Sequence, residues 1–513
     1  MSTTSREKLC TADEAVQRVK DGDAVVCGGF VGAAHPEALT AALERRFLNG
    51  GNPENLTLVY AAGQGDGKSR GLNHLAHEGL VKRVIGGHWG LAPAMGKLAI
   101  ENKIEAWNFS QGVICQLLRD IAAGRPGCIT HVGLGTFLDP DHGGGKLNEG
   151  TTDDLVEKVE LAGKPWLFYH AFPVNVGLIR ATTADPSGNL SMEDEVIVGE
   201  VLAIAQAVRN NGGIVIAQVK RLSNHPADPH SVRVPGILVD RIVVANEGEH
   251  DQTFDEPMKE AFCTAASPSD VAEKFDPMPQ SIRRIIAARA CDELQPGDIA
   301  NLGIGIPEGV GRIAGERGML DRVTLTVESG PIGGIPAGGL SFGASAHPQA
   351  IVDQPAQFDF YDGGGLDFAA LGCAQVDRTG NVNVSKFGAR LAGVGGFVNI
   401  SQNARKLVFC GTMTSGGLEV VVEEGKLVIV KEGGTKKFVE EVEQISFSGV
   451  LAAESGRSIH YVTERAVFEL TPAGPELIEM APGIDLEKDV LDQMGFPPII
   501  NEIRPMPAHL FES

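Results

Sequence analysis

The 513-residue sequence lacks the features that mark secreted, membrane or nucleic-acid-binding proteins. Its eight cysteines form no Cys-x-x-Cys pair, which argues against a zinc site or a disulfide framework. No apolar run reaches the ~18 residues needed to cross a bilayer, and the polar N-terminus has no signal-peptide core. A formal net charge of −22 argues against nucleic acid or an anionic membrane as the main partner. These absences favour a cytoplasmic enzyme, and they leave room for a small anionic ligand held by a few local cations and backbone amides.

Aromatic residues are also few, at 5%, whereas glycine is abundant, with 65 residues. That glycine content is well above the usual ~7%. It is typical of a chain with many tight strand-to-helix turns and with backbone that approaches a ligand closely. The length exceeds what one hydrophobic core supports, so two domains of roughly 200–250 residues are expected.

One carboxylate stands out because the sequence contains a second copy of its surroundings. Residues 56–63 match residues 323–330 position for position, and Ala61 falls where Glu328 stands. Both segments begin with a strand-like run of β-branched and apolar residues. A strand does not need a glutamate at that place, so Glu328 is predicted to serve chemistry.

Three further matches occur in the same order in both halves of the chain, which indicates an internal duplication. The matched pairs are residues 22–30 with 297–305, 35–37 with 306–308, and 185–190 with 377–382. The first copy carries about 75 additional residues between its second strand and Asp185.

Each half therefore follows the pattern of strand, glycine turn and helix, which predicts an open, largely parallel α/β sheet. We expect two tandem, internally duplicated domains, at residues 1–266 and 283–513, joined by a polar linker at 267–282. A late β-hairpin is predicted at residues 419–430. Ligands of such sheets bind beyond the carboxyl ends of the strands, where Glu328 and the turn at 303–305 would lie.

Several motif matches point elsewhere and are weaker. Residues 62–69 approach a phosphate-binding loop but are followed by a poor helix start, so a turn is preferred. Residues 139–150 begin like a calcium loop, yet Gly150 stands where a glutamate is required. His35, His88 and His347 lack metal-ligand spacing and are interpreted as histidines of turns or supporting positions.

Residues 339–343 match the nucleophile elbow G-x-S-x-G, with Ser341 at its centre. That motif requires a strand immediately before it, and glycines precede it here. We expect a glycine-rich active-site loop, and we keep a serine-dependent acyl-CoA thioesterase as the alternative function. A non-catalytic regulator that binds a sugar phosphate or another effector is a further alternative, although no helix-turn-helix or basic segment accompanies it.

Together, residues 303–307, 328–330 and 386–397 resemble a family I coenzyme A transferase. The similarity spans nearly the whole chain and is greatest to the single-chain acetate/propionate CoA-transferase group, in which both halves are fused. The resemblance implies an active site between the two halves. It also implies reversible, ping-pong transfer of CoA from a short-chain acyl-CoA to a carboxylic acid such as acetate, propionate or a 3-oxoacid.

By this resemblance Glu328 is the nucleophile that becomes a glutamyl–CoA thioester. The amide of Gln111, with Gly395 and Gly396, would stabilise the oxyanions of the tetrahedral steps. The remaining residues implied are those that contact CoA, namely Gly303, Ile304, Gly305, Ile306, Pro307 and Lys386. Lys386 and Arg390 are interpreted either as counter-ions of the CoA phosphates or as a solvated basic turn. No metal and no cofactor besides CoA as substrate is expected, and relatives suggest a homo-oligomer.

Overall fold

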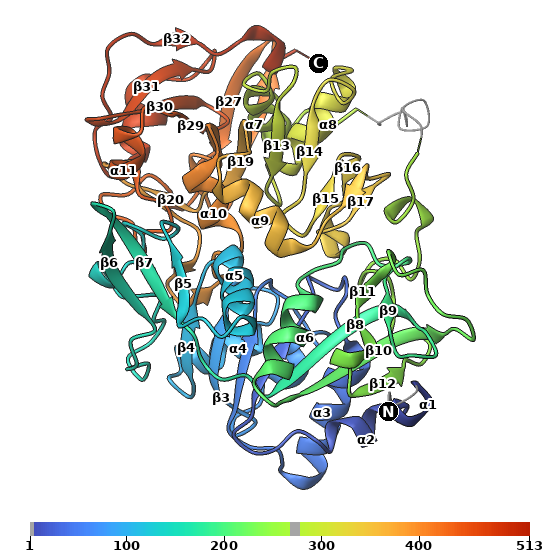
Figure 1. Cartoon of the computed structure of the whole chain (residues 1–513). Helices are drawn as coiled ribbons and strands as arrows, with labels where there is room; N and C mark the ends of the chain where they lie inside the picture. The colour runs from blue at the N-terminus through green and yellow to red at the C-terminus, as the bar shows by residue number, and fades with distance from the viewer. Residues whose placement is uncertain (1–4, 267–276, 513) are drawn as a thin grey trace.

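The structure is a computed structural model, and it describes residues 5–266 and 277–512. Each half of the chain builds one large sheet flanked by helices, and Figure 1 shows the first half (blue to green) below the second (yellow to red). The two sheets confirm the predicted open α/β architecture.

The first sheet is parallel through its centre, with a short antiparallel addition at one end of β8. Its strands are β12 (Arg241–Val244), β10 (Ile214–Leu222), β8 (Val176–Ala184), β1 (Ala24–Cys27), β2 (Leu56–Tyr60), β3 (Val81–Gly86) and β4 (Glu105–Asn108), in spatial order, and the addition is β9 (Leu190–Ser191) with β11 (Val232–Val234).

The second sheet repeats the central order of the first. Strands β24, β19, β13 and β14 are parallel neighbours, as are β10, β8, β1 and β2. The whole sheet consists of β18 (Ala350–Ile351), β15 (Pro331–Ile332), β14 (Thr324–Thr326), β13 (Ile299–Leu302), β19 (Phe368–Gly372), β24 (Lys406–Cys410), β29 (Ser458–Val462), β30 (Ala466–Thr471), β31 (Gly474–Met480) and β32 (Arg504–Pro505). Its flanks depart from the first sheet, because β15, β18, β30 and β31 pair antiparallel.

The central strands are buried on both faces, as expected where helices cover both sides of a parallel sheet. In β1, Val25 and Cys27 belong to one hydrophobic core and Val26 belongs to the other, following the alternation of side chains along a strand. The core that contains Val26 continues into the second half, so the two halves pack against each other through a shared apolar interior.

A helix begins within or directly after each of the matched segments 35–37 and 306–308, and each of these segments contains a proline. Pro36 precedes α3 and Pro307 precedes α8, and a fixed φ suits proline to a helix start. The longer helices are α3 (Glu37–Gly50), α4 (Pro93–Ile100), α5 (Gln111–Ala122), α6 (Val201–Asn210), α7 (Ile282–Cys291), α8 (Glu308–Glu316), α9 (Gln354–Asp362) and α10 (Phe397–Asn403); the shorter ones are α1 (Ser5–Lys8), α2 (Ala12–Val16) and α11 (Gly449–Glu454). Helices α5, α9 and α10 meet where the two halves face each other (Figure 1).

The duplication extends to individual hydrogen bonds. Asp185 accepts the amide of Asn189, and the Asn189 side chain in turn accepts the amide of Gly236. The second half repeats these bonds with Asp377, Asn381 and Gly449. The two turns are therefore equivalent in sequence and in contact, as the matched segments predicted.

The additional residues of the first copy supply elements that the second half lacks in this position. They form β3, α4, β4 and α5, followed by a small antiparallel sheet of β5 (Gly127–Thr130), β6 (Val156–Leu161) and β7 (Lys164–His170). The predicted late hairpin is confirmed as β26 (Glu419–Glu423) and β27 (Lys426–Lys431), with a left-handed turn at Glu424 and Gly425.

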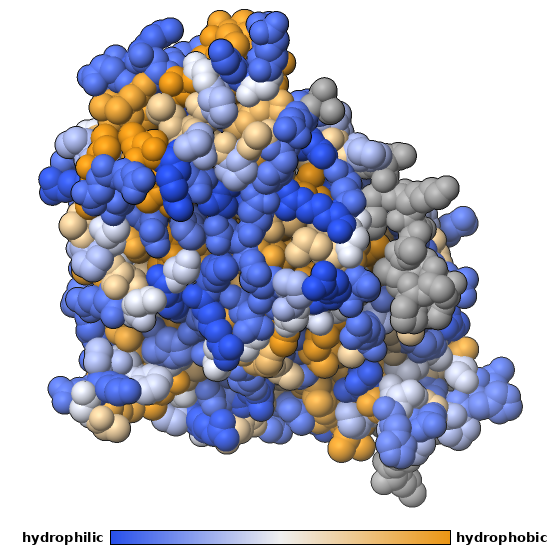
Figure 2. Space-filling view, turned by 90° about the horizontal axis from the view of Figure 1, so that it is seen from above, coloured by the Kyte–Doolittle hydropathy of each residue, from blue (hydrophilic) through white to orange (hydrophobic). Residues whose placement is uncertain are grey.

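Residues 267–276 of the predicted linker lie outside the described residues, and α7 begins at Ile282, so the domain boundaries stay predictions. Within residues 5–266 and 277–512, no helix combines the length and the hydropathy that a membrane span requires. Figure 2 views the molecule from the side of the second half, and the face it shows is mainly hydrophilic, with the largest groups of hydrophobic side chains at the top and upper left.

Candidate active site

A cavity of about 550 Å³ lies between the two halves, at the carboxyl ends of their central strands. The loops after β1 and β2 line it from the first half, and the loops after β13, β14 and β19 line it from the second. This is the edge of the sheet where the sequence predicted a ligand site. The lining residues discussed below are Phe30, Val31, Gly63, His88, Gln111, Asn301, Gly303, Ile304, Gly305, Glu308, Glu328, Gly339, Phe342, Phe387, Arg390, Gly395 and Gly396.

Glu328 lies just beyond β14, and its side chain faces this cavity while only 8% of the residue is exposed. The Asn301 amide on neighbouring β13 donates a hydrogen bond of 3.3 Å to Glu328 Oε2. Burial raises the pKa of Glu328, and the bond from Asn301 opposes that rise. The carboxylate is thus poorly solvated and has few donors around it, which makes it more basic and more nucleophilic than one in water.

A second pair of contacts holds Asn301 in place. The Asn301 amide also approaches the Tyr361 hydroxyl at 3.3 Å, and that hydroxyl lies 2.7 Å from Thr326 Oγ1. Tyr361 and Thr326 are both buried. The orientation of the amide that contacts Glu328 is therefore fixed by two neighbouring elements, α9 and β14.

Gln111 opens helix α5 and reaches the same cavity from the first half. Only 2% of the residue is exposed, and within the described part of the chain its Nε2 has no hydrogen-bond partner. A buried amide donor without a partner is costly in a folded protein unless a ligand supplies the acceptor.

Gly395 and Gly396 lie between these two side chains. A Cβ added to Gly396 would stand 3.3 Å from Glu328 Cγ, and one added to Gly395 would stand 3.6 Å from Gln111 Oε1. The Gly395 amide, however, donates to the carbonyl of Gly87 at 2.8 Å, and the Gly395 carbonyl accepts from Gln111 N at 2.8 Å. Gly395 therefore uses its backbone to fix Gln111. Gly396 is the N-cap residue of helix α10, where backbone amides have no partner within the helix, so Gly396 is the better placed of the two predicted amide donors.

The turn after β13 contributes part of the predicted CoA-contacting set. Gly303, Ile304 and Gly305 line the cavity, whereas Ile306 packs against the core and Pro307 precedes α8. The Gly303 amide donates to Ala370 and the Gly305 amide donates to Glu308, so both are already bonded within the protein. This turn therefore lines the cavity with its backbone and with Ile304, which is 54% exposed.

Comparison with known proteins identifies the family of this arrangement. A family model described as Coenzyme A transferase matches residues 10–245. The chain is 44% identical over 510 residues to the acetate CoA-transferase YdiF of Escherichia coli (strain K12), covering 99% of this chain and 95% of that protein. It is 45% identical over 515 residues to the caffeate CoA-transferase of Acetobacterium woodii, covering 98% and 97%. The chain belongs to the coenzyme A transferase family.

The solved structures agree with this assignment. A crystal structure of the acyl-CoA transferase YdiF from E. coli O157:H7, described as a thioester complex with CoA, matches with a TM-score of 0.92 at 44% identity. The match covers 98% of this chain and 96% of that one. The resemblance stated from the sequence is thereby confirmed, and the protein is an enzyme that transfers coenzyme A.

The transferase fold leaves Ser341 in a role other than that of a nucleophile. Ser341 ends a 3₁₀ turn (Gly339–Ser341), and its Oγ lies 2.8 Å from the hydroxyl of Thr253. Among the described residues, no histidine is recorded as its hydrogen-bond partner. A serine nucleophile needs an adjacent base, so the geometry does not support the thioesterase alternative.

The two basic residues near the transferase cavity differ in position. Lys386 is outside the residues that line it, and its Nζ donates to the carbonyl of Leu147 at 3.2 Å. Arg390 does line the cavity, is exposed, and stacks on the Phe387 ring at 5.5 Å. Of the pair, Arg390 is the one placed to meet an anionic group at the cavity edge.

Sequence reasoning missed Asn301 and underestimated His88. Asn301 stands where the first copy has Val26. Comparison of the two copies could therefore have identified Asn301 as a candidate site residue, because only the second copy has a polar residue at this position. His88 follows β3 and lines the cavity, and burial lowers its pKa to about 4, which leaves the imidazole neutral near pH 7. No local pattern marked His88, because its cavity neighbours belong to distant segments.

Proposed function

We propose that this transferase moves CoA between short-chain carboxylic acids through a thioester on Glu328. The observation that carries the proposal is the pairing of a buried, weakly solvated carboxylate with an amide nitrogen, Gln111 Nε2, that has no hydrogen-bond partner among the described residues, across one cavity. The names of the relatives, acetate and caffeate CoA-transferase, support an acyl-CoA donor and a carboxylic acid acceptor.

In the first half-reaction the Glu328 carboxylate attacks the acyl-CoA carbonyl carbon. The carbon–sulfur bond breaks, CoA leaves as a thiolate, and an acyl–glutamyl anhydride remains. The thiolate then attacks the glutamyl carbonyl carbon, which forms the glutamyl–CoA thioester and releases the acid as a carboxylate. A second carboxylate reverses both steps. Splitting one exchange into such steps is the advantage of covalent catalysis.

Each addition creates an oxyanion that needs preorganised donors. Gln111 Nε2 and the Gly396 amide would supply them, and one such donor is typically worth about 3–4 kcal/mol of barrier. Binding of the long CoA moiety can also be used to orient the reacting carbonyl against Glu328. Short acids such as acetate, propionate or a 3-oxoacid, including those of ketone-body metabolism, are the acceptors we propose.

Intact-mass measurement of the enzyme mixed with propionyl-CoA alone tests the mechanism. The protein should gain the mass of CoA less water, and peptide mapping should place the adduct on Glu328. Glu328→Ala should lose the adduct and reduce exchange by about 10⁴-fold or more. Glu308→Gln, at the other carboxylate of the cavity, is the matched control and should still form the adduct on Glu328. An adduct on another residue would refute the proposal.

We also propose that the enzyme is cytoplasmic and forms a homo-oligomer. All eight cysteines are free, which suits a reducing compartment. Val421, Val428 and Val430 on the β26–β27 hairpin are 40%, 39% and 58% exposed, and such side chains favour contact with another copy. Cell fractionation and light scattering after size-exclusion chromatography would test the two statements.

A further inference from the structure

The loop after β1 holds two non-glycine residues in the left-handed conformation, Val31 at φ 55° and Ala34 at φ 53°. A β-branched residue rarely adopts positive φ, because its side chain clashes with the backbone there. Strain of this kind persists where the surroundings enforce it and gathers at ligand sites. Val31 lines the cavity described above, whereas Ala34 is outside the lining residues.

The surroundings of Val31 enforce its conformation. The Val31 amide donates to Gly63 at 2.7 Å, and the Val31 carbonyl accepts from Gly65 at 2.9 Å. Gly32 packs closely against Phe254, because a Cβ there would come within 2.4 Å of the Phe254 ring.

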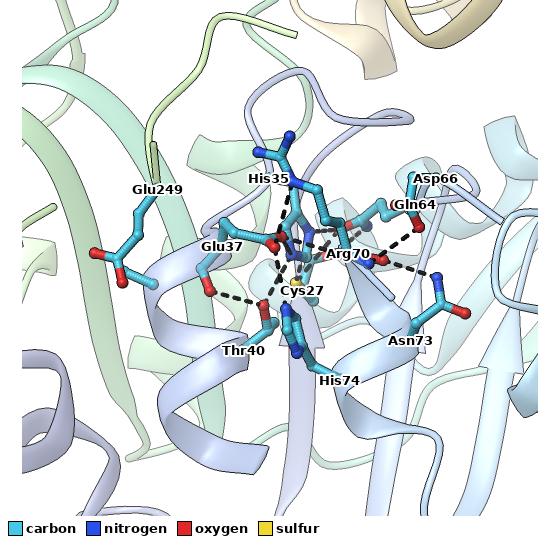
Figure 3. A network of polar contacts seen from close by, with 12 residues as sticks. Cys27, His35, Glu37, Thr40, Gln64, Asp66, Arg70, Asn73, His74 and Glu249 are labelled. Carbon is cyan, nitrogen blue, oxygen red and sulfur yellow. Dashed lines mark hydrogen bonds and ion pairs between the residues drawn. The ribbon is translucent and has the colours of Figure 1, made fainter. Parts of the chain in front are cut away.

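The far end of the loop is anchored by His35. Its Nδ1 lies 2.7 Å from Gln64 Oε1 and its Nε2 lies 2.9 Å from Thr40 Oγ1, as Figure 3 shows. His35 itself is fully buried. The loop is therefore fixed at both ends, and the direction of the Val31 side chain is fixed with it.

Val31 belongs to the buried, apolar end of the cavity. Val31 and Phe30 are each 4% exposed, and the Phe30 ring lies 5.5 Å from that of Phe342. A Cβ on Gly343 would come within 2.5 Å of the Phe30 ring. The Gly343 carbonyl in turn accepts a hydrogen bond from Ser329, the neighbour of Glu328. The Phe30 ring is thus linked to the proposed nucleophile through Gly343 and Ser329.

The cavity reaches solvent through Ile304, Gly339 and Arg390, which are all exposed. CoA carries a charged, phosphate-bearing tail that must remain near water or cations. The exposed end therefore suits CoA, and the apolar end remains for the hydrocarbon part of the exchanged acid.

We propose, on the basis of the function proposed above, that Val31 is a specificity-determining residue of this transferase. Its side chain, held in the left-handed turn, closes the apolar end of the cavity and limits the length of the acyl chain. A smaller residue lengthens the space available, and a larger one shortens it.

The test compares kcat/KM for acetate, butyrate and hexanoate as acceptors from one donor, propionyl-CoA. Val31→Gly should raise the hexanoate-to-acetate ratio by about 10-fold or more, since each methylene in an apolar pocket is worth about that factor. Val31→Ile should lower the butyrate-to-acetate ratio. Ala34→Gly is the matched control: it removes the same left-handed strain away from the cavity and should leave both ratios unchanged.

Results that contradict the role of Val31 differ from results that contradict the Glu328 thioester. Equal losses for all three acids in the folded Val31 variants, or ratios that match the wild type, would overturn the inference while leaving the Glu328 thioester standing. A change of ratio in Ala34→Gly as large as in Val31→Gly would also overturn it, because loop strain would then explain the effect. A wild-type enzyme without a Glu328 adduct would instead refute the proposed function.

Discussion

A carboxylate buried beside an apolar core is stable only if neighbouring groups support its charge. In the second half, Asn301, Thr326 and Glu328 form a polar cluster together with Tyr361. The matching positions of the first half are Val26, Val59 and Ala61, all within the hydrophobic core. The duplicated scaffold thus places a polar site in one copy and core in the other, on equivalent strands.

We predict that Asn301→Ala makes the transferase more sensitive to acid. Burial already raises the pKa of Glu328, and removing the Asn301 bond raises it further, so less of the reactive carboxylate is ionised at a given pH. The acidic limb of the kcat/KM profile should move to higher pH. At pH 7 the value should fall about 10-fold, as expected for loss of a hydrogen bond to a charged group.

Tyr361→Phe provides the comparison for this prediction. It removes a hydroxyl that contacts Asn301 and Thr326 but retains the Asn301 amide itself, which loses one of the contacts that orient it. Its limb should move less than that of Asn301→Ala. An unmoved limb in Asn301→Ala would mean that the amide does not influence the ionisation of Glu328.

For single residues, the sequence predicts site residues that differ between the two copies. It does not predict residues whose role depends on contacts between segments far apart in the chain. Glu328 was found because Ala61 stands in its place, and the same comparison would have found Asn301. The contact of Lys386 with Leu147 joins positions 239 residues apart, which no local pattern reveals. The hydrogen bond from the Gly395 amide to the Gly87 carbonyl cannot be predicted for the same reason.

Among the elements, the two halves are joined by a reciprocal pair of asparagines. Asn108, at the end of β4, accepts the amide of Val394 from the second half at 3.0 Å. Asn399, on α10, accepts the amide of Gly112 from the first half at 3.2 Å and donates to Asp362 on α9. These bonds align the start of α5, which carries Gln111, with the start of α10, which follows Gly396.

We predict that Asn399→Ala lowers kcat more than it changes KM. The Gly112 amide and the Asp362 carboxylate would lose a buried partner, which should destabilise the protein by about 2–4 kcal/mol. The two proposed oxyanion donors would also lose alignment, and kcat should fall about 10–100-fold. Urea unfolding and steady-state kinetics measure the two effects.

Asn403→Ala is the matched control for the asparagine pair. Asn403 is one turn further along α10, approaches the same Asp362 at 3.4 Å and contacts His131, with no recorded bond to α5. It should lower stability with little effect on kcat. Equal effects of the two variants on kcat would show that α10 as a whole, and not its bond to α5, is responsible.

Elements with a strong local pattern were the ones that the sequence predicted. Strands β1, β2, β13 and β14, the helices after the proline steps and the β26–β27 hairpin followed from periodicity and turn residues. The antiparallel strands β15 and β18 were missed, because each is two residues long and is defined by its partner alone.

Across the whole molecule, buried carboxylates respond to pH in opposite directions. Burial raises the pKa of Glu37, but the hydrogen bond from His74, the charge of His35 and the hydrogen bond from the Gly71 amide together outweigh it and bring the pKa to about 2. Figure 3 labels Glu37, His35 and His74. Glu200, at the start of α6, differs: burial raises its pKa to about 8. Among the described residues, neither oxygen of Glu200 has a hydrogen-bond partner.

The sign of each effect follows from the shift. Glu37 has a folded pKa below its unfolded value of ~4.3, so the stability it contributes is present above that value and is lost as the pH falls toward 2. Glu200 has a folded pKa above its unfolded value, so its contribution is present below ~4.3 and is lost as the pH rises through 8. Glu37 therefore favours neutral pH, and Glu200 favours acid.

We predict that Glu200→Gln flattens the alkaline side of the stability curve. Over the interval from pH 4.5 to 8, ionisation of the unfolded state alone should cost the wild type about 4 kcal/mol through this one residue. The variant, which cannot ionise, should show a free energy of unfolding that declines less over that interval. Glu37→Gln should instead flatten the acidic side, between pH 4.5 and 2.5. Urea unfolding at a series of pH values measures both slopes. A wild-type slope that Glu200→Gln leaves unchanged between pH 5 and 8 would mean that the carboxyl of Glu200 finds a compensating partner or reaches water.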